Sequence, residues 1–213
     1  MTKVKICGLR TLADVRLVNQ YLPDYVGFVF AKTRRLVADD QALLMRQMLD
    51  QRIQAVGVFV NEPIAHVIRL CDMNAIDAVQ LHGDEPESYI RQIKDKTGIT
   101  IIKAVRVQCS DQVVEDMSEN ADFMLFDTYK KGIPGGTGER FPMEVLQESF
   151  TKLRERNQII KPYFLAGGLD CDSVAQVICR TNCYAVDVST GVETDGIKNG
   201  EKIKNFLNIV RQL

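Results

Sequence analysis

The chain has 213 residues, of which 46% are hydrophobic, so one domain of this length can bury roughly 70% of the surface that its unfolded chain exposes. Its 27 basic residues nearly balance its 28 acidic residues, which leaves no global charge to attract nucleic acid or an anionic membrane. The first ten residues, MTKVKICGLR, lack the apolar core of a signal peptide, and no apolar run reaches the roughly 20 residues that span a bilayer. We therefore expect a cytoplasmic protein with no nucleic-acid or membrane partner.

Eight short apolar runs alternate with amphipathic stretches, which is the order expected of βα units in a parallel sheet. Runs such as GFVF and VGVFV lack strict alternation, as is typical of strands that are covered on both faces. The predicted strands are residues 4–7, 25–30, 54–60, 78–81, 100–105, 123–127, 163–166 and 185–188.

Helix signals lie between these runs. Residues 38–50 carry apolar side chains close to the i, i+3, i+4, i+7 spacing of one helix face. Two acidic–proline pairs, at residues 62–63 and 85–86, each follow a strand and indicate a helix start, and a further helix is expected over 172–180. No linker or repeat divides the chain, so residues 1–213 are expected to form a single domain.

Eight strands that alternate with helices predict an α/β fold, a single (β/α)8 TIM barrel, although an open doubly wound sheet uses the same alternation. In a barrel, functional residues lie at the C-terminal ends of the strands or in the loops just after them. We therefore expect the candidate site residues to meet at the C-terminal end of the barrel.

Two consecutive strand ends have the composition of a phosphate cradle. Gly167 and Gly168 follow the seventh strand and precede a helix, so their backbone N–H groups and the helix dipole can approach an anion. The eighth strand ends in Ser189, Thr190 and Gly191, which add two hydroxyl groups. Loops seven and eight of such barrels frequently hold the phosphate of a substrate, although two tight turns would give the same pattern.

Cys7 and Asp127 end the first and sixth strands. A thiol with a pKa near 8.5 needs nearby positive charge to ionise, and Lys5, two residues earlier, shares a strand face with Cys7. Whether that face is the catalytic one is left open by the sequence. An acidic residue at the end of a buried strand is expected at the mouth of the barrel.

Two further segments suggest ligand binding. Residues 128–141 contain four glycines and are longer than an ordinary connector, which favours a binding loop over a disordered insertion. Arg34 and Arg35 follow the second strand and could bind a substrate carboxylate, or they could be solvated surface residues.

The remaining cysteines have a simpler interpretation. The chain contains no CxxC pair and only two histidines, so we expect no metal site. In a reducing compartment we expect five of the six cysteines to be small core residues. These five are Cys71, Cys109, Cys171, Cys179 and Cys183.

Taken in order, several motifs resemble the phosphoribosylanthranilate isomerase family over essentially the whole chain. KICG combined with QLHG and VDVSTGVE is highly specific, unlike any single glycine turn. The motifs are KICGL, VGFVF, VGVFVN, VQLHG, LFDT, GGTGERF, AGGLD and VDVSTGVE.

The resemblance implies an aldose–ketose isomerase of tryptophan biosynthesis, which converts N-(5'-phosphoribosyl)anthranilate to 1-(2-carboxyphenylamino)-1-deoxyribulose 5-phosphate by an Amadori rearrangement. It implies that Cys7 is the general base, that Asp127 is the general acid and that no cofactor is needed. Arg35, with Arg34 as the alternative, is expected to bind the anthranilate carboxylate. The other substrate-binding residues are expected to be Gln80 and His82, and the phosphate-binding residues Gly167, Gly168, Ser189, Thr190 and Gly191.

Other functions use related features. Another sugar-phosphate barrel, such as a metal-dependent epimerase, would need ligands that two histidines, His66 and His82, do not supply. His66 falls in a helix pattern, whereas His82 ends the fourth strand. A non-catalytic sensor of a phosphorylated ligand would use the phosphate cradle but would need neither Cys7 nor Asp127. The sequence leaves open whether the chain is a monomer or a homodimer, and whether it accepts the related aminoaldose of histidine synthesis.

Overall fold

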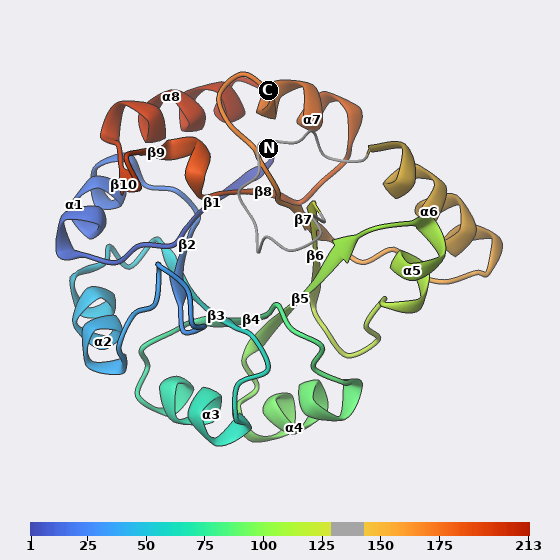
Figure 1. The fold of residues 1–213 in the computed structure, drawn as a ribbon, viewed down its shortest axis with the longest axis horizontal. Helices are drawn as coiled ribbons and strands as arrows, with labels where there is room; N and C mark the ends of the chain where they lie inside the picture. The colour runs from blue at the N-terminus through green and yellow to red at the C-terminus, as the bar shows by residue number, and fades with distance from the viewer. Residues whose placement is uncertain (129–142) are drawn as a thin grey trace.

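Residues 1–128 and 143–213 are described by a computed structural model of the chain. Within them, eight parallel strands pair in sequence order and close into a barrel, because β8 returns to pair with β1 (Figure 1). The predicted glycine-rich loop falls almost entirely outside the described residues. The barrel strands are β1 (Lys3–Cys7), β2 (Tyr25–Val29), β3 (Gln54–Phe59), β4 (Ala78–Leu81), β5 (Thr100–Val107), β6 (Phe123–Thr128), β7 (Tyr163–Leu165) and β8 (Ala185–Val188).

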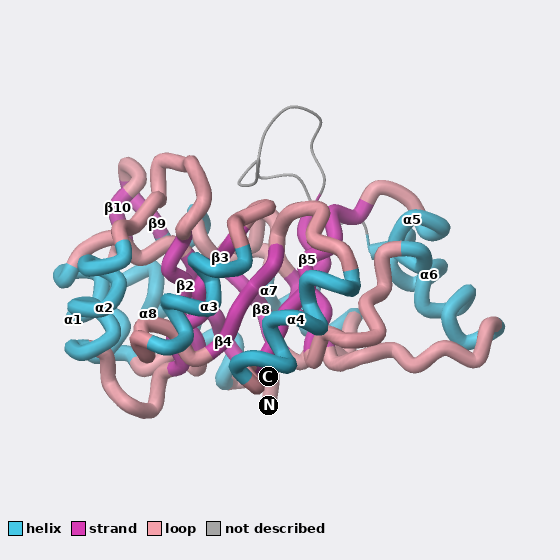
Figure 2. Tube along the Cα trace, turned by 90° about the horizontal axis from the view of Figure 1, so that it is seen from below, coloured by secondary structure: helices cyan, strands magenta, loops and turns pink. Residues whose placement is uncertain are grey.

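Helices surround the strand ring on the outside (Figure 1). Seen from the side, a small β9–β10 hairpin lies at one end of the barrel, whereas both chain termini lie at the other end (Figure 2). The helices are α1 (Leu12–Tyr21), α2 (Asp39–Met48), α3 (Ile64–Asp72), α4 (Glu87–Thr97), α5 (Ser110–Glu115), α6 (Met143–Glu155), α7 (Val174–Arg180) and α8 (Gly200–Arg211). The connection from β8 to α8 contains a short 3-10 helix, η1 (Thr190–Val192), and the strands β9 (Glu193–Thr194) and β10 (Ile197–Lys198).

The predicted barrel is confirmed, and the open doubly wound sheet is excluded by the pairing of β1 with β8. The strand bounds differ most at β5, which continues to Val107 rather than ending at residue 105. The helix expected over 172–180 begins only at Val174. The two prolines of the acidic–proline pairs lie immediately before α3 and α4. The β9–β10 hairpin was not predicted, because strands of two residues are too short for a periodic pattern.

Strand β1 shows how the barrel separates its two faces. Val4 and Ile6 pack in the large cluster between strands and helices, whereas Cys7 packs with Val29 and Val58 on the inner side. Because side chains alternate along a strand, Lys5 shares the inner face with Cys7. The strand face that Lys5 and Cys7 share, which the sequence left unassigned, is therefore the inner face of the barrel.

An aspartate immediately before each of three even-numbered strands anchors the N-terminal end of the barrel. Asp24, Asp77 and Asp122 accept hydrogen bonds from the backbone N–H groups of Val4, Ala55 and Ile101, at 2.8–2.9 Å. Each bond joins the start of one strand to the preceding strand, which fixes their relative register.

The described cysteines are less uniformly buried than predicted. Cys183 is buried, whereas Cys71 and Cys171 are partly buried. The prediction of a core position was wrong for Cys109 and Cys179, which are exposed. Cys109 occupies the turn before α5, and Cys179 lies near the C-terminal end of α7, so neither side chain faces the barrel.

In the described ranges no helix is long and apolar enough to cross a membrane.

His66 links two of the outer helices. Its Nδ1 lies 2.6 Å from a carboxylate oxygen of Glu62, and its Nε2 lies 2.8 Å from a carboxylate oxygen of Asp39 at the start of α2. Partial burial lowers the pKa of His66, but the hydrogen bonds and charges of Glu62 and Asp39 outweigh it, so the net shift is upward. The cationic imidazole therefore stabilises the contact between α2 and α3.

A folded-state pKa that is raised gives stability that is complete below the unfolded pKa of about 6.5 and is lost as the pH rises through the folded value. We expect His66→Gln to lower the free energy of unfolding by on the order of 1 kcal/mol at pH 6. The difference from the parent chain should shrink as the pH rises above neutral. Urea denaturation of both proteins across this pH range measures it, and a constant difference would contradict the role of the charged imidazole.

Candidate active site

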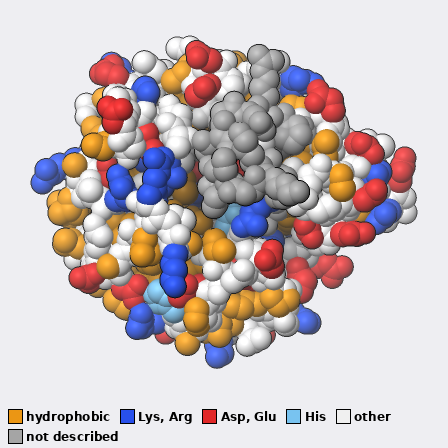
Figure 3. Space-filling model, viewed as in Figure 1, with side chains coloured by type: hydrophobic (Ala, Val, Ile, Leu, Met, Phe, Trp, Pro, Cys, Tyr) orange, Lys and Arg blue, Asp and Glu red, His pale blue; other side chains and the backbone are white. Residues whose placement is uncertain are grey.

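A cavity of about 570 Å³ opens at the C-terminal end of the barrel. Basic side chains gather on the rim of this face, on the side of β1 and β2 (Figure 3). The cavity wall brings together predicted residues from several strands and loops: Cys7, Arg34, Arg35, Gln80, His82, Asp127, Gly167, Gly168, Ser189 and Thr190.

Gly191, the remaining predicted residue, packs behind this wall. A Cβ at Gly191 would lie 2.0 Å from the carbonyl oxygen of Leu169 in the loop after β7. Glycine is therefore needed here so that the loops after β7 and β8 can touch. Its place in the structure is between the two predicted phosphate loops rather than on the cavity surface.

Close packing fixes the position of Cys7 at the end of β1. Its register partner on β2 is Gly27, where a Cβ would lie 2.6 Å from the thiol sulfur. The next residue, Gly8, has φ of +84°, and a Cβ there would lie 2.3 Å from Cδ of Arg35. These two glycines let the thiol and the arginine occupy one wall of the cavity.

A buried ion pair lies beside Cys7 on the inner face of the barrel. The fully buried Lys5 donates from Nζ to Oδ2 of Asp187 at 2.9 Å, and the Asp187 side chain is only 8% exposed. Lys5 and Asp187 are register partners across the seam between β1 and β8. The second carboxylate oxygen, Oδ1, is buried and has no hydrogen-bond partner among the described residues.

These charges act on the thiol in opposite directions. Burial raises the pKa of Cys7, the charge of Lys5 lowers it, that of Asp187 raises it, and that of Lys198 lowers it. The net shift is upward, so the substrate-free site favours the thiol over the thiolate.

Asp127, on β6, faces His82 at the end of β4. Oδ2 of Asp127 lies 3.3 Å from Nε2 of His82, and Nδ1 of His82 lies 3.0 Å from the amide nitrogen of Gln80. Because an amide nitrogen can only donate, Nδ1 accepts and Nε2 carries the proton. Gln80 thus hydrogen-bonds to His82, and the other ring nitrogen of His82 lies close to the Asp127 carboxylate.

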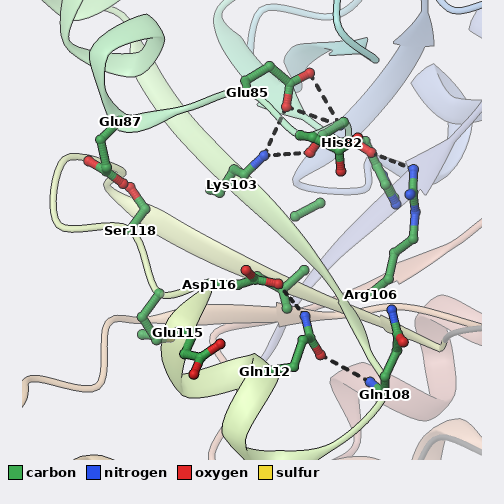
Figure 4. Close-up of a pocket in the computed structure, with 15 residues that line it drawn as sticks. His82, Glu85, Glu87, Lys103, Arg106, Gln108, Gln112, Glu115, Asp116 and Ser118 are labelled. Atoms are coloured by element: carbon green, nitrogen blue, oxygen red, sulfur yellow. Dashed lines mark hydrogen bonds and ion pairs between the residues drawn. The ribbon is translucent and has the colours of Figure 1, made fainter.

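A second cavity, of about 320 Å³, is also lined by His82 (Figure 4). It shows how the loop after β4 is held. Lys103 donates from Nζ to the carbonyl oxygen of Gly83 at 2.6 Å and to a carboxylate oxygen of Glu85 at 2.9 Å. Arg106 donates to the carbonyl oxygen of His82 at 2.8 Å. The same Glu85 carboxylate accepts from the N–H groups of Gly83 and Asn61. Glu85 therefore binds Lys103 and loop amides, rather than serving as the acidic residue of a helix start.

The two arginines after β2 are both tied to one carboxylate that the sequence analysis missed. Arg35 donates from Nε and Nη2 to Glu193 at 3.1–3.2 Å, and Arg34 donates to the same carboxylate at 3.1 Å. The Arg35 side chain is 19% exposed, compared with 59% for Arg34. Both arginines line the cavity, but Arg35 is the more buried, and Glu193 binds its planar guanidinium through two nitrogens.

The loops after β7 and β8 have the backbone that an anion site needs, with one correction. Gly167 and Gly168 have φ of +96° and +64°, which glycine adopts at no steric cost. The N–H groups of Asp172 and Ser173, in the turn before α7, are not free for an anion, however, because the Asp170 side chain accepts hydrogen bonds from both. A capacity to bind an anion therefore rests on the loop backbones and on the Thr190 hydroxyl group, because the Ser189 hydroxyl group already donates to the carbonyl oxygen of Cys7 at 2.9 Å.

The sequence did not indicate the positions or partners of four charged residues at this site, which are Lys5, Asp187, Glu193 and Lys198. Lys5 and Asp187 carry a weak signal, since a charge inside an apolar strand indicates a buried partner. Glu193 ends the motif VDVSTGVE, but nothing there indicates its partners, and Lys198 carries no signal because it lies in a connection without periodicity. Their proximity to the arginines follows only from the folded loops.

Comparison with known proteins identifies the family that the chain matches. Residues 4–209 match the family model described as N-(5'phosphoribosyl)anthranilate (PRA) isomerase. The chain is 45% identical over 208 residues to the N-(5'-phosphoribosyl)anthranilate isomerase of Lachnoclostridium phytofermentans, covering 96% of this chain and 95% of that protein.

Solved structures agree with the sequence match. The chain is similar to phosphoribosyl anthranilate isomerase from Thermotoga maritima, with a TM-score of 0.85, 31% identity and full coverage of both chains. It is also similar to a phosphoribosyl anthranilate isomerase in complex with reduced 1-(o-carboxyphenylamino)-1-deoxyribulose 5-phosphate, with a TM-score of 0.82, 31% identity and full coverage of both chains.

The buried pair beside Cys7 gives a test of this site's construction. We expect Lys5→Met to lower the free energy of unfolding by about 3 to 5 kcal/mol, because it leaves the Asp187 carboxylate buried without its counter-ion. The same change at Lys3, whose exposed side chain pairs with Asp24 at 2.8 Å, should cost less than about 1 kcal/mol. Urea denaturation compares the two variants, and equal losses would show that the Lys5 pair is no more important than a surface pair.

Proposed function

The chain belongs to the N-(5'-phosphoribosyl)anthranilate isomerase family, and we propose that its barrel, as one catalytic domain, uses Cys7 as general base and Asp127 as general acid. The reaction of this family is the aldose–ketose rearrangement of N-(5'-phosphoribosyl)anthranilate in tryptophan biosynthesis. The observation that carries the assignment of roles is the shared cavity, in which Cys7 and Asp127 lie with Arg35 and the two glycine-rich loops. A substrate with a carboxylate at one end and a phosphate at the other matches these groups.

The first chemical step in this proposal opens the sugar ring. Asp127, in its protonated form, gives a proton to the furanose ring oxygen, and the electron pair of the anthranilate nitrogen forms a C1–N double bond as the C1–O bond breaks. Nε2 of His82 lies 3.3 Å from Asp127, close enough to hold the carboxyl group toward the substrate. Gln80 fixes the imidazole tautomer that makes this possible.

The second step moves hydrogen from C2 to C1. Cys7, as thiolate, removes the C2 proton, and the electron pair left behind neutralises the iminium to give an enolamine. Tautomerisation then places a proton on C1 and leaves a ketone at C2, which is the aminoketose product. Each well-placed proton transfer is typically worth 10² to 10⁴ in rate.

The remaining groups bind the ends of the substrate away from the reacting atoms. Arg35 is proposed to bind the anthranilate carboxylate, since Glu193 already fixes the orientation of its guanidinium. The loops that contain Gly167, Gly168, Ser189 and Thr190, joined at Gly191, are proposed to bind the phosphate. Binding energy from these remote groups holds the sugar in the orientation that the proton transfers need.

The acid–base roles are tested by the decay of phosphoribosylanthranilate fluorescence, with substrate generated in place from anthranilate. We expect rapid decay with the parent chain and a rate at least about 100-fold lower with Cys7→Ala or Asp127→Asn. Cys109→Ala removes an exposed cysteine and should retain full activity. Full activity of Cys7→Ala would exclude the proposed base, and binding of substrate without turnover by the parent chain would favour a ligand sensor.

The choice between the two arginines is tested by their separate removal. We expect Arg35→Met to raise KM by about 10- to 100-fold, the equivalent of one charge-assisted hydrogen bond. Arg34→Met, which removes a side chain that is 59% exposed, should change KM by less than about threefold. Steady-state kinetics of both variants decides the question, and a larger effect at Arg34 would reverse the assignment.

A further inference from the structure

Lys198, on β10, is a buried cation to which the proposed mechanism gives no role. Its side chain is 2% exposed, and its ammonium group donates to Oε1 of Glu193 at 2.9 Å and to the carbonyl oxygen of Ser189 at 3.0 Å. Removing an ammonium group from water is costly, so a lysine buried to this extent needs compensating partners. The β9–β10 hairpin provides them at the rim of the catalytic face.

The contacts of Lys198 connect it to Cys7 through the loop after β8. Ser189 accepts from Lys198 at its carbonyl oxygen, and its own hydroxyl group donates to the carbonyl oxygen of Cys7 at 2.9 Å. Ser189 alone thus connects the ammonium group of Lys198 to the backbone of Cys7, through one hydrogen bond on each side. Any displacement of Lys198 would move this loop relative to β1.

The two lysines that act on Cys7 differ in how their charges are paired. Lys5 pairs with Asp187, whose charge acts on the thiol in the opposite direction, and among the cations Lys5 lowers the pKa of Cys7 most, followed by Lys198. The Glu193 carboxylate, in contrast, is shared by Lys198, Arg34 and Arg35. Three cations on one carboxylate leave a net positive charge on this side of the thiol.

We propose that Lys198 is a positioning residue for the base: its buried ammonium group adds to Lys5 a second positive charge that stabilises the Cys7 thiolate, and it holds the β8 loop against β1. The catalytic consequence rests on the proposed role of Cys7. The electrostatic effect on the thiol does not, and can be measured without substrate.

The titration of the thiol is set by groups on several elements. Burial and Asp187 on β8 raise the pKa of Cys7, whereas Lys5 on β1 and Lys198 on β10 lower it. The adjacent β2 contributes Gly27, which has no charge, and the stem of Arg35 packs over Gly8. His82 and Asp127 face the same cavity from β4 and β6. Burial lowers the pKa of Lys198 itself, and this is partly offset by Glu193 and by Cys7.

The test measures the pH dependence of Cys7 alkylation by iodoacetamide on the full chain, resolved by mass spectrometry of the Cys7 peptide. Lys198→Gln removes the charge but retains a hydrogen-bond donor, and Lys198→Arg retains the charge. We expect the midpoint for Cys7 to rise by about one pH unit in Lys198→Gln, so that alkylation near neutral pH slows about tenfold. Lys198→Arg should restore most of the rate.

Matched controls separate this effect from a change in structure. Lys202 is an exposed neighbour that donates to the backbone carbonyl oxygen of Glu193 at 2.7 Å, so Lys202→Gln should leave the Cys7 midpoint unchanged. The exposed Cys109 and Cys179 serve as references in the same sample. Circular dichroism checks the fold, and Lys198→Met takes the place of Lys198→Gln if the latter does not fold, with the same expected result.

Kinetics then relate the thiol to turnover. We expect Lys198→Gln to lower kcat near neutral pH with a smaller effect on KM, and to move the acidic limb of the pH–rate profile upward. An unchanged Cys7 midpoint in Lys198→Gln, or an equal shift in Lys202→Gln, would overturn the proposal. If the midpoint shifts but Cys7→Ala remains active, the electrostatic role of Lys198 stands and the assignment of Cys7 as base fails.

Discussion

The pairing of β8 with β1 is the constraint on which the rest of the structure depends. It closes the strand ring, and its register places Lys5 directly beside Asp187. The two residues are 182 positions apart in the chain, yet their ion pair is buried beside Cys7. A shift of this register by one residue would turn the aspartate away from the barrel interior and leave a buried ammonium group unpaired.

Closure also gives the site its circular order. Asp127 lies at the end of β6, the two loops proposed to bind phosphate follow β7 and β8, Cys7 lies at the end of β1, and Arg35 follows β2. The proposed phosphate site therefore separates the proposed acid from the proposed base on one side of the ring, and the proposed carboxylate site lies next to the base. A substrate held at both ends would bring its sugar between the two proton-transfer groups.

The groups that perform the proposed chemistry are held by charged neighbours that do not react. Glu85 and Lys103 hold the loop of His82, and Glu193 holds Arg35. These supporting contacts are largely buried, where ion pairs fix geometry better than flexible surface pairs do. Local packing contributes as well, since Gly8 and Gly27 leave space only for the arginine stem and the thiol.

The sequence by itself determined the eight strands, the position of Cys7 and Asp127 at strand ends, and the family to which the motifs belong. These features are local, because strand patterns and glycine turns depend on residues within a few positions of one another. Only the tertiary structure decided that Lys5 faces the interior with Cys7, and that Glu193 and Lys198 join Arg35 at the rim. Such contacts join residues that lie far apart in the chain, as with the 158 positions between Arg35 and Glu193, and no local pattern encodes a partner that closure of the barrel brings into reach.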